Sequence, residues 1–200
     1  MPVEDQKRHA AEAAAEYVRD GMLIGLGTGS TAAYLVRILG NRVREGLSIR
    51  AIPTSEETNR LATQEGIELV FPAENTAIDL VIDGADEVDS SGNLIKGGGG
   101  ALLREKIIAD AGARMIVIAD ASKRVSQLGD FPLPVEVERF SWPLTIQKIR
   151  KVLAECGLGG AGMTLRAGTR DTGGGVFLTD GGHYIVDISC HRIHDAPALE

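Results

Sequence analysis

A run of four glycines, Gly97 to Gly100, follows Lys96 and directly precedes a segment of helical character. Consecutive glycines are costly in backbone entropy, and a loop that carries them usually needs left-handed angles or a close approach of the backbone to a ligand. The amides of such a loop could stabilise negative charge that develops on a carbonyl oxygen. The alternative is that the run is a simple flexible hinge.

Glu105 lies in the first turns of the helix predicted over residues 101–111. Its neighbours on a helical wheel are apolar: Ala101, Leu102, Ile108 and Ala109. A carboxylate in such surroundings, beside a glycine-rich loop, is a candidate general base, because burial favours the protonated form over the charged one. A solvated or ion-paired side chain is the more common arrangement for a single helical glutamate, and the adjacent loop favours the catalytic interpretation.

The segment Gly27-Thr-Gly-Ser-Thr31 combines glycines, hydroxyls and the start of a predicted helix. The amides at a helix N-terminus point outward and favour an anion, most simply a phosphate. The alternative is a tight turn in which Ser30 or Thr31 caps the helix. The segment is neither a dinucleotide-binding fingerprint nor a P-loop, because the third glycine of the one and the Gly-Lys-Ser/Thr of the other are missing.

A third polar segment, Asp83-Gly-Ala-Asp-Glu-Val-Asp89, concentrates four carboxylates. Its spacing does not match a calcium-binding loop. Carboxylates are strong hydrogen-bond acceptors, so the functional interpretation of this segment is hydrogen bonding to sugar hydroxyls. The alternative is an acidic surface turn.

These polar segments recur in an alternation of apolar strands and helices. Strands are predicted at 22–26, 49–52, 67–71, 79–82 and 114–119; helices at 8–19, 30–39, 54–65 and 101–111, with Gly40, Gly66 and Gly112 ending the last three. A capping-box pattern, Thr54-Ser-Glu-Glu57, opens the third helix. Apolar strands that alternate with helices indicate an α/β fold, a Rossmann-like, mostly parallel sheet flanked by helices. Four polar loops follow the carboxyl ends of predicted strands, the edge at which such sheets bind ligands. They are Gly27–Thr31, Pro53–Ser55, Asp83–Glu87 and Asp120–Lys123.

The pattern changes after Pro132. A strand is predicted at 133–137, a helix at 143–156, and short β-like runs at 163–166, 175–179 and 183–188. We therefore expect a main α/β catalytic domain over residues 1–130, and a small α+β subdomain over residues 131–200 that returns to the main sheet.

Bulk properties narrow the choice of partner and compartment. The net charge of −7 disfavours nucleic-acid binding. No apolar run has the length of a membrane span, and the N-terminal residues lack the layout of a signal peptide, so we expect a cytoplasmic protein without membrane contact. Cys156 and Cys190 support neither a disulfide framework nor a zinc site.

Read together, the segments resemble ribose-5-phosphate isomerase of the A type, from about Gln6 to Glu200. The resemblance rests on motifs in this order: GLGTGSTA at 25–32, TSEET at 54–58, DGADEVD at 83–89, KGGGGALLREKI at 96–107, IADASK at 118–123 and FPLPVEV at 131–137. It implies an aldose–ketose isomerase that interconverts ribose 5-phosphate and ribulose 5-phosphate in the non-oxidative pentose phosphate pathway. It further implies that no metal or organic cofactor is used, and that the chain forms a homodimer or homotetramer.

The resemblance also implies roles for individual residues. Glu105 would move the proton between C2 and C1, Asp83 and Asp86 would hold sugar hydroxyls and assist ring opening, and Lys96 would stabilise the oxyanion. The implied substrate-binding set is Lys7, Thr28, Gly29, Ser30, Thr31, Asp83, Gly84, Ala85, Asp86, Lys96, Gly97, Gly98, Gly99 and Lys123.

The chain departs from the family pattern at Leu103, where threonine is common, and at Gly100, where alanine is common. Relatives also continue beyond the position of Glu200 into another strand. Three other functions fit the sequence less well. A sugar-phosphate sensor would usually carry a DNA-reading domain, and the segment before residue 20 is too short for one. An acyl-CoA transferase is disfavoured by the small size and the Asp83/Asp86 pair, and a nicotinamide oxidoreductase by the missing fingerprint.

Overall fold

The computed structural model describes residues 1–168 and 174–199. The chain forms two compact units. The first contains Met1–Ala85 and Leu103–Lys123, and the second contains Asp86–Leu102 and Arg124–Glu200. The chain therefore passes from one unit to the other at Ala85, at Leu102 and at Lys123.

The first unit is built on a five-stranded parallel sheet in the order β3-β2-β1-β4-β7. Its strands are β1 (Leu23–Leu26), β2 (Arg50–Pro53), β3 (Glu68–Leu69), β4 (Leu80–Asp83) and β7 (Met115–Val117). Its helices are α1 (Val3–Ala15), α2 (Ser30–Arg44), α3 (Glu56–Gln64) and α4 (Leu102–Ala111), followed by the short 3₁₀ helix η1 (Ala121–Lys123). The predicted α/β fold class is confirmed.

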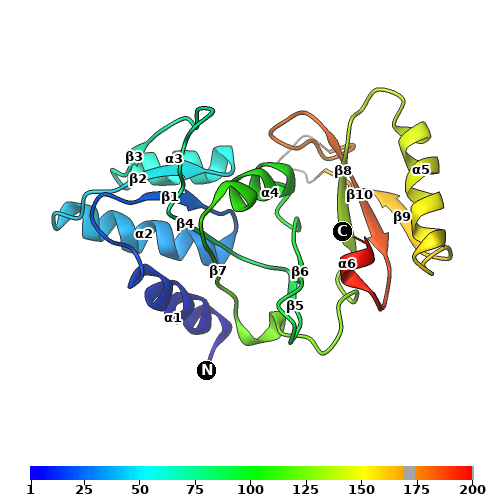
Figure 1. Cartoon of the computed structure of the whole chain (residues 1–200), viewed down its shortest axis with the longest axis horizontal. Helices are drawn as coiled ribbons and strands as arrows, with labels where there is room; N and C mark the ends of the chain where they lie inside the picture. Colours follow the sequence, from blue (N-terminus) through cyan, green and yellow to red (C-terminus); the bar gives the residue numbers. More distant parts are fainter. Residues whose placement is uncertain (169–173, 200) are drawn as a thin grey trace. The chain divides into compact units, whose positions relative to one another are not determined.

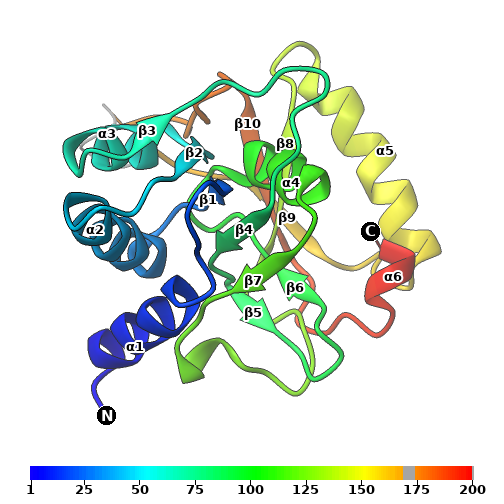
Figure 2. The ribbon, with the colours of Figure 1, turned by 60° about the vertical axis from the view of Figure 1, so that its left-hand side comes forward.

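Alternate strand residues point to opposite sides of the sheet. Both faces of this sheet are buried, since each set of side chains packs in an apolar cluster. Ile24, Leu26 and Ile82 belong to an apolar cluster that includes buried residues of α1, α2 and α3. Leu23 and Val81 belong to a second cluster, with Ile108 of α4. Figure 2 shows the same layering, with α1, α2 and α3 on one side of the strands and α4 on the other.

Several predicted boundaries in the first unit are wrong by a few residues. Helix α2 does not end at Gly40 but continues to Arg44, and the left-handed glycine after it is Gly46, with φ of +110°. Gly40 instead gives space to the C-terminal end of α3, since a Cβ there would lie 2.5 Å from the Cβ of Glu65. The cap of α3 is Ser55, whose side chain accepts a hydrogen bond from the backbone N–H of Thr58, rather than Thr54.

The second unit has a three-stranded antiparallel sheet in the order β8-β10-β9, and a two-stranded hairpin. Its elements are β5 (Glu87–Val88), β6 (Leu94–Ile95), β8 (Leu133–Val137), α5 (Trp142–Glu155), β9 (Gly162–Leu165), β10 (Tyr184–Ser189) and α6 (Ala196–Leu199). Helix α5 runs alongside the sheet (Figure 1), and its Leu153 shares an apolar cluster with Val186 and Ile188 of β10. The run predicted at 175–179 forms only an isolated bridge between Ala167 and Val176.

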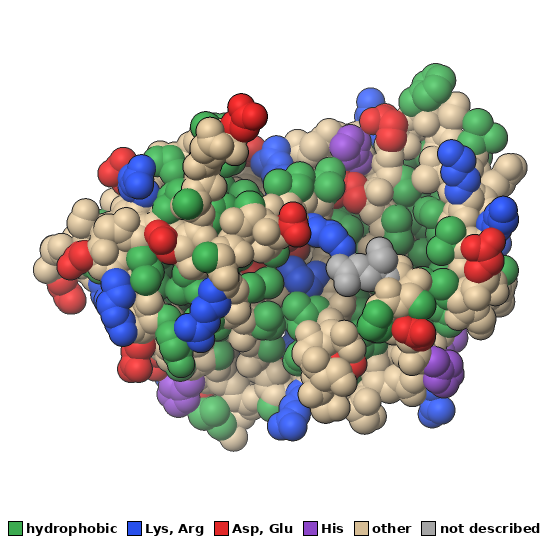
Figure 3. Space-filling model, viewed as in Figure 1, with side chains coloured by type: hydrophobic (Ala, Val, Ile, Leu, Met, Phe, Trp, Pro, Cys, Tyr) green, Lys and Arg blue, Asp and Glu red, His purple; other side chains and the backbone are tan. Residues whose placement is uncertain are grey.

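Charged side chains of both signs are interspersed over the visible face of the first unit, on the left of Figure 3. No helix among residues 1–168 and 174–199 has the length and apolar composition that crossing a membrane requires.

The core of the first unit yields a stability prediction. Ile24 has an exposed fraction of 0%, whereas Ile107 on α4 is 57% exposed. We expect Ile24→Ala to lower the free energy of unfolding by about 2–5 kcal/mol, because a cavity adds to the lost burial. The matched change Ile107→Ala should cost less than about 1 kcal/mol. Urea unfolding of both variants checks this, and equal losses would contradict the assignment of the core.

Candidate active site

The residues proposed from sequence divide between the two units. The first unit contains Lys7, Thr28 to Thr31, Asp83, Gly84, Ala85, Glu105 and Lys123. The second unit contains Asp86, Lys96 and Gly97 to Gly99.

The loop between β1 and α2 ends in an open helix N-terminus. Gly29, with φ of +118°, is the N-cap, and α2 begins at Ser30. The alternative in which Ser30 or Thr31 caps the helix is therefore wrong. Within the described part of the chain, the amides of Ser30, Thr31 and Ala32 donate to no acceptor, as expected for a first turn without a side-chain cap. Such a turn suits an anion.

Buried hydroxyl groups hold this loop in place. The Thr28 hydroxyl lies 2.8 Å from that of Thr54 and 3.3 Å from that of Thr58. Thr54 Oγ1 donates to the carbonyl oxygen of Leu26, and Thr58 Oγ1 donates to that of Gly27. The TSEET motif thus fixes the loop from the start of α3. The sequence predicts a helix cap here and a polar loop at the edge of the sheet, but no pattern in it predicts that these hydroxyls fix the preceding loop.

Asp83, the last residue of β4, joins two of the predicted loops. Its side chain is buried, with an exposed fraction of 1%. Oδ1 accepts hydrogen bonds from the backbone N–H of Thr28 at 3.1 Å and of Gly84 at 2.7 Å. A Cβ on Gly27 would lie 1.9 Å from the same oxygen. The carboxylate therefore occupies the space that a side chain at Gly27 would need.

Glu105 is buried, as its helical position predicts. Its exposed fraction is 4%. One turn further along α4, Ile108 packs onto β1 so closely that a Cβ on Gly25 would lie 2.6 Å from Ile108 Cγ2. The fit of Ile108 against Gly25 holds α4 against the sheet.

The two proposed phosphate-binding lysines of the first unit lie in segments that are hydrogen-bonded to each other. Lys7, on α1, forms an ion pair with Glu4 at 2.8 Å, which raises the lysine pKa. Gln6, also on α1, accepts a hydrogen bond from the backbone N–H of Ala121 at the start of η1, the helix that ends at Lys123.

Asp120 organises η1. Burial would raise the pKa of its carboxyl group, but hydrogen bonds from the hydroxyl and backbone N–H of Ser122, together with the nearby charges of Lys123 and Lys7, outweigh burial and lower that pKa. The ionised carboxylate is thus the form that the fold stabilises.

In the second unit, the glycine run forms a tight turn that Asp86 holds. The N–H of Gly100 donates to the carbonyl oxygen of Gly97 at 3.0 Å, and both residues have positive φ, +107° at Gly97 and +81° at Gly100. The need for left-handed angles predicted from the run is confirmed. Asp86 Oδ2 accepts from the N–H of Gly98 at 2.7 Å. Among the described residues, the amides of Gly97 and Gly99 donate to none.

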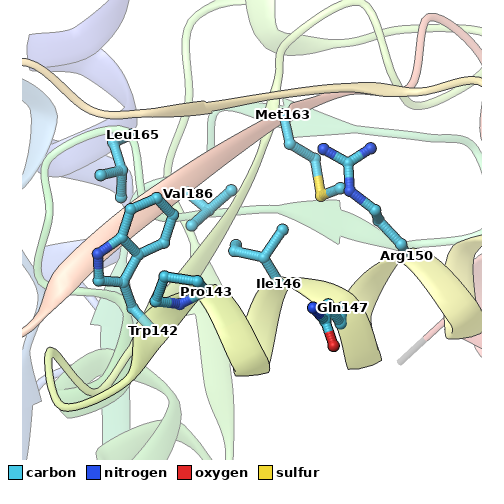
Figure 4. A pocket seen from close by; sticks show the side chains of 8 residues that line it. All are labelled: Trp142, Pro143, Ile146, Gln147, Arg150, Met163, Leu165 and Val186. Carbon is cyan, nitrogen blue, oxygen red and sulfur yellow. The ribbon is translucent and has the colours of Figure 1, made fainter.

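The second unit also has a groove that is not suited to a sugar phosphate. It has a volume of about 330 Å³ and lies between α5 and the strands β9 and β10 (Figure 4). Its lining is mainly apolar: Trp142, Pro143, Ile146, Gln147, Arg150, Met163, Leu165 and Val186. Apart from Arg150 and Gln147 it offers few polar side chains, whereas the predicted loops are rich in them.

Comparison with known proteins now decides the family. The family model described as ribose 5-phosphate isomerase A (phosphoriboisomerase A) matches residues 50–200. The chain belongs to this family. A ribose-5-phosphate isomerase A from Rhodopseudomonas palustris (strain BisB18) is 54% identical over 199 residues, which is 100% of this chain and 84% of the relative. The corresponding protein of Agrobacterium fabrum is 52% identical, with the same coverage.

Solved structures of this isomerase family have the same fold. The ribose 5-phosphate isomerase A of Methanocaldococcus jannaschii superposes with a TM-score of 0.88 at 42% identity, covering 98% of this chain and 84% of that one. A D-ribose-5-phosphate isomerase in complex with phospho-erythronic acid gives a TM-score of 0.88 at 39% identity, covering 98% of this chain and 82% of that one.

The close approach at Gly27 gives a prediction for the isomerase fold. We expect Gly27→Ala to lower the free energy of unfolding by about 1–3 kcal/mol, because the new methyl group would displace the Asp83 carboxylate. Inorganic phosphate binding should weaken with it, measured by calorimetry. Gly160→Ala is the control, because a Cβ there meets nothing within 4 Å. Unchanged stability and phosphate binding in Gly27→Ala would contradict the described packing.

The lowered pKa of Asp120 gives a pH prediction. A carboxyl group whose pKa is lower in the folded state stabilises the fold above its unfolded pKa of about 3.9, and this contribution is lost as the pH falls through the folded value. The wild-type chain should therefore be more stable than Asp120→Asn at pH 7, with the difference shrinking below about pH 4. Denaturant unfolding at both pH values measures it, with exposed Asp130→Asn as control. A difference that grows on acidification would refute the assignment.

Proposed function

We propose that this chain interconverts D-ribose 5-phosphate and D-ribulose 5-phosphate by proton transfer through an enediolate. Family membership over the full chain supports the reaction class. The structural observation that carries the proposal is Glu105, a buried carboxylate that follows the Lys96–Gly100 run in the sequence. An aldose–ketose exchange needs one such base, together with donors for a developing oxyanion and a handle for the phosphate.

Glu105 would act on the open-chain sugar. Its carboxylate takes the proton from C2, the electron pair of that C–H bond forms the C1–C2 double bond, and the carbonyl oxygen at C1 becomes the enediolate oxygen. The proton of the C2 hydroxyl passes to the oxygen at C1, so that the negative charge moves to the oxygen at C2. Glu105 then returns its proton to C1, and the oxygen at C2 becomes the ketone. Atoms and electrons balance within the sugar, so the step needs no redox cofactor, and we propose that it also proceeds without a metal.

The second set of roles concerns the developing charge. We assign Lys96 and the amides of the glycine run to the enediolate oxygens, since preorganised donors gain most where the charge appears in the transition state. Asp83 and Asp86, with Gly84 and Ala85 connecting them, would hold the sugar hydroxyls and assist ring opening, because carboxylates are strong hydrogen-bond acceptors.

The phosphate group would bind to the first unit. The first turn of α2 offers the amides of Ser30 and Thr31 as donors. Gly29 adopts the positive φ that the turn before the helix requires, and Thr28 fixes the loop through its hydrogen bond to Asp83. Lys7 and Lys123 would add positive charge. A phosphate held at a distance from the reacting carbons positions the substrate without taking part in the chemistry.

The resemblance also supports a cytoplasmic location and a homodimeric or homotetrameric state. Light scattering on the purified chain measures the mass in solution, and a monomer at working concentration would rule out the assembly.

The first experiment compares ribulose 5-phosphate formation by the wild-type chain and by Glu105→Gln, with EDTA present. We expect metal-independent activity that falls by about 10²–10⁴-fold in the variant, because glutamine cannot accept the proton. Glu12→Gln, an exposed glutamate of α1, is the matched control and should keep full activity.

The outcomes separate the function from the base. Activity that survives Glu105→Gln would keep the isomerase and exclude Glu105 as its base. A folded wild-type chain that binds ribose 5-phosphate but does not isomerise it would favour a sugar-phosphate sensor.

A further inference from the structure

Arg166, which follows β9, binds the backbone of the glycine run. Its Nη1 donates to the carbonyl oxygens of Gly97 at 2.8 Å and of Gly98 at 3.1 Å. The other side of the guanidinium faces Asp187 on β10, with Nε at 2.9 Å from Oδ2 and Nη2 at 2.5 Å from Oδ1. One planar group thus connects the central strand of the antiparallel sheet to the turn.

The guanidinium is held firmly by its surroundings. The side chains of Arg166 and Asp187 are only 15% and 25% exposed. A two-pronged pair between arginine and a carboxylate fixes the plane of the guanidinium as well as its position. The ring of Phe177 lies over the same group, 5.9 Å from the guanidinium carbon to the ring centre, and it also covers Gly100, where a Cβ would lie 2.5 Å from the ring.

Peptide geometry converts this contact into control of the amides. The C=O and N–H of one trans peptide point in opposite directions. In the Gly97–Gly98 peptide, the carbonyl oxygen is bound by Arg166 and the N–H by Asp86, so this unit is fixed from both sides. In the Gly98–Gly99 peptide, the carbonyl oxygen is bound by Arg166, so the N–H of Gly99 must point away from the guanidinium.

Gly99 is exposed, and within the described residues its amide donates to no protein acceptor. We propose that Arg166, oriented by Asp187, is a positioning residue for the isomerisation, and that it aims the Gly99 amide at the enediolate oxygen. The inference rests on the function proposed above. A hydrogen bond to the carbonyl oxygen also polarises the peptide, which makes its N–H a better donor.

The first test compares Arg166→Ala with Arg150→Ala, an exposed arginine of α5. We expect kcat to fall by about 10- to 100-fold in Arg166→Ala while KM changes by less than about threefold, because the lost contact acts on charge that appears in the transition state. Arg150→Ala should keep both constants. A kcat within twofold of wild type in Arg166→Ala overturns the proposal.

Ligand binding separates positioning from general damage. Phospho-erythronic acid carries a carboxylate where the substrate carries its reacting carbons, so its affinity should weaken about tenfold or more in Arg166→Ala. Inorganic phosphate, whose proposed partners all belong to the first unit, should bind as in wild type. Equal weakening of both ligands would indicate a general loss of structure and overturn the proposal.

Asp187 provides an independent check. If it acts only through Arg166, Asp187→Ala should lower kcat in the wild-type background but not in Arg166→Ala. Arg166→Lys should restore little activity, because an ammonium lacks the planar fork. Additive losses, or full rescue by lysine, would overturn the positioning role.

Amide hydrogen exchange distinguishes this inference from the proposed function. The Gly98 N–H should exchange faster in Arg166→Ala than in wild type, and this readout needs no catalysis. If the wild-type chain is inactive but the Gly98 N–H still exchanges faster in Arg166→Ala, the proposed isomerase function is wrong while the control of the turn by Arg166 stands. If instead the wild-type chain is active and Arg166→Ala alters neither exchange nor kcat, the isomerase function stands and the role of Arg166 is overturned.

Discussion

The buried carboxylate of Asp83 is the interaction on which the first unit's loops depend. Burying an ionised carboxylate is costly unless hydrogen bonds replace the lost water, and here the amides of Thr28 and Gly84 supply them. The same hydrogen bonds that compensate the buried carboxylate also fix the loop after β1 to the end of β4. Gly27 is needed for the same reason, since any side chain there would meet the carboxylate.

In the second unit, the carboxylate of Asp86 likewise fixes a loop, because it accepts a hydrogen bond from the N–H of Gly98. A chain of glycines has many backbone conformations, and selecting one of them costs conformational entropy. Hydrogen bonds between backbone atoms of the run and the charged side chains of Asp86 and Arg166 offset that loss of entropy. In both units, therefore, a charged side chain fixes backbone groups, and the backbone then offers the donors for an anion.

Much of this could be predicted from the sequence, because the strands and polar loops depend on local patterns. The α/β class, the buried Glu105 and the left-handed angles of the glycine run follow from apolar periodicity and from residue type. The path of α2 through Gly40 could not be predicted, since the space there is filled by Glu65. Arg166 was missed for the same reason: its partners, Gly97, Gly98 and Asp187, are distant in the sequence, and no local pattern marks a side chain that binds backbone carbonyls.

Counting protons in the hydroxyl network around Thr28 shows what that residue can offer a ligand. Thr54 and Thr58 each have a backbone carbonyl as acceptor for their single hydroxyl proton. With those protons so placed, the hydroxyl of Thr28 is the donor in its contact with Thr54. The Thr28 N–H is likewise taken by Asp83. Toward a ligand Thr28 therefore presents only lone pairs, which repel a dianion. We therefore expect a bound anion to take its hydrogen bonds from other groups of this loop, such as the amides of Ser30 and Thr31, and from cations.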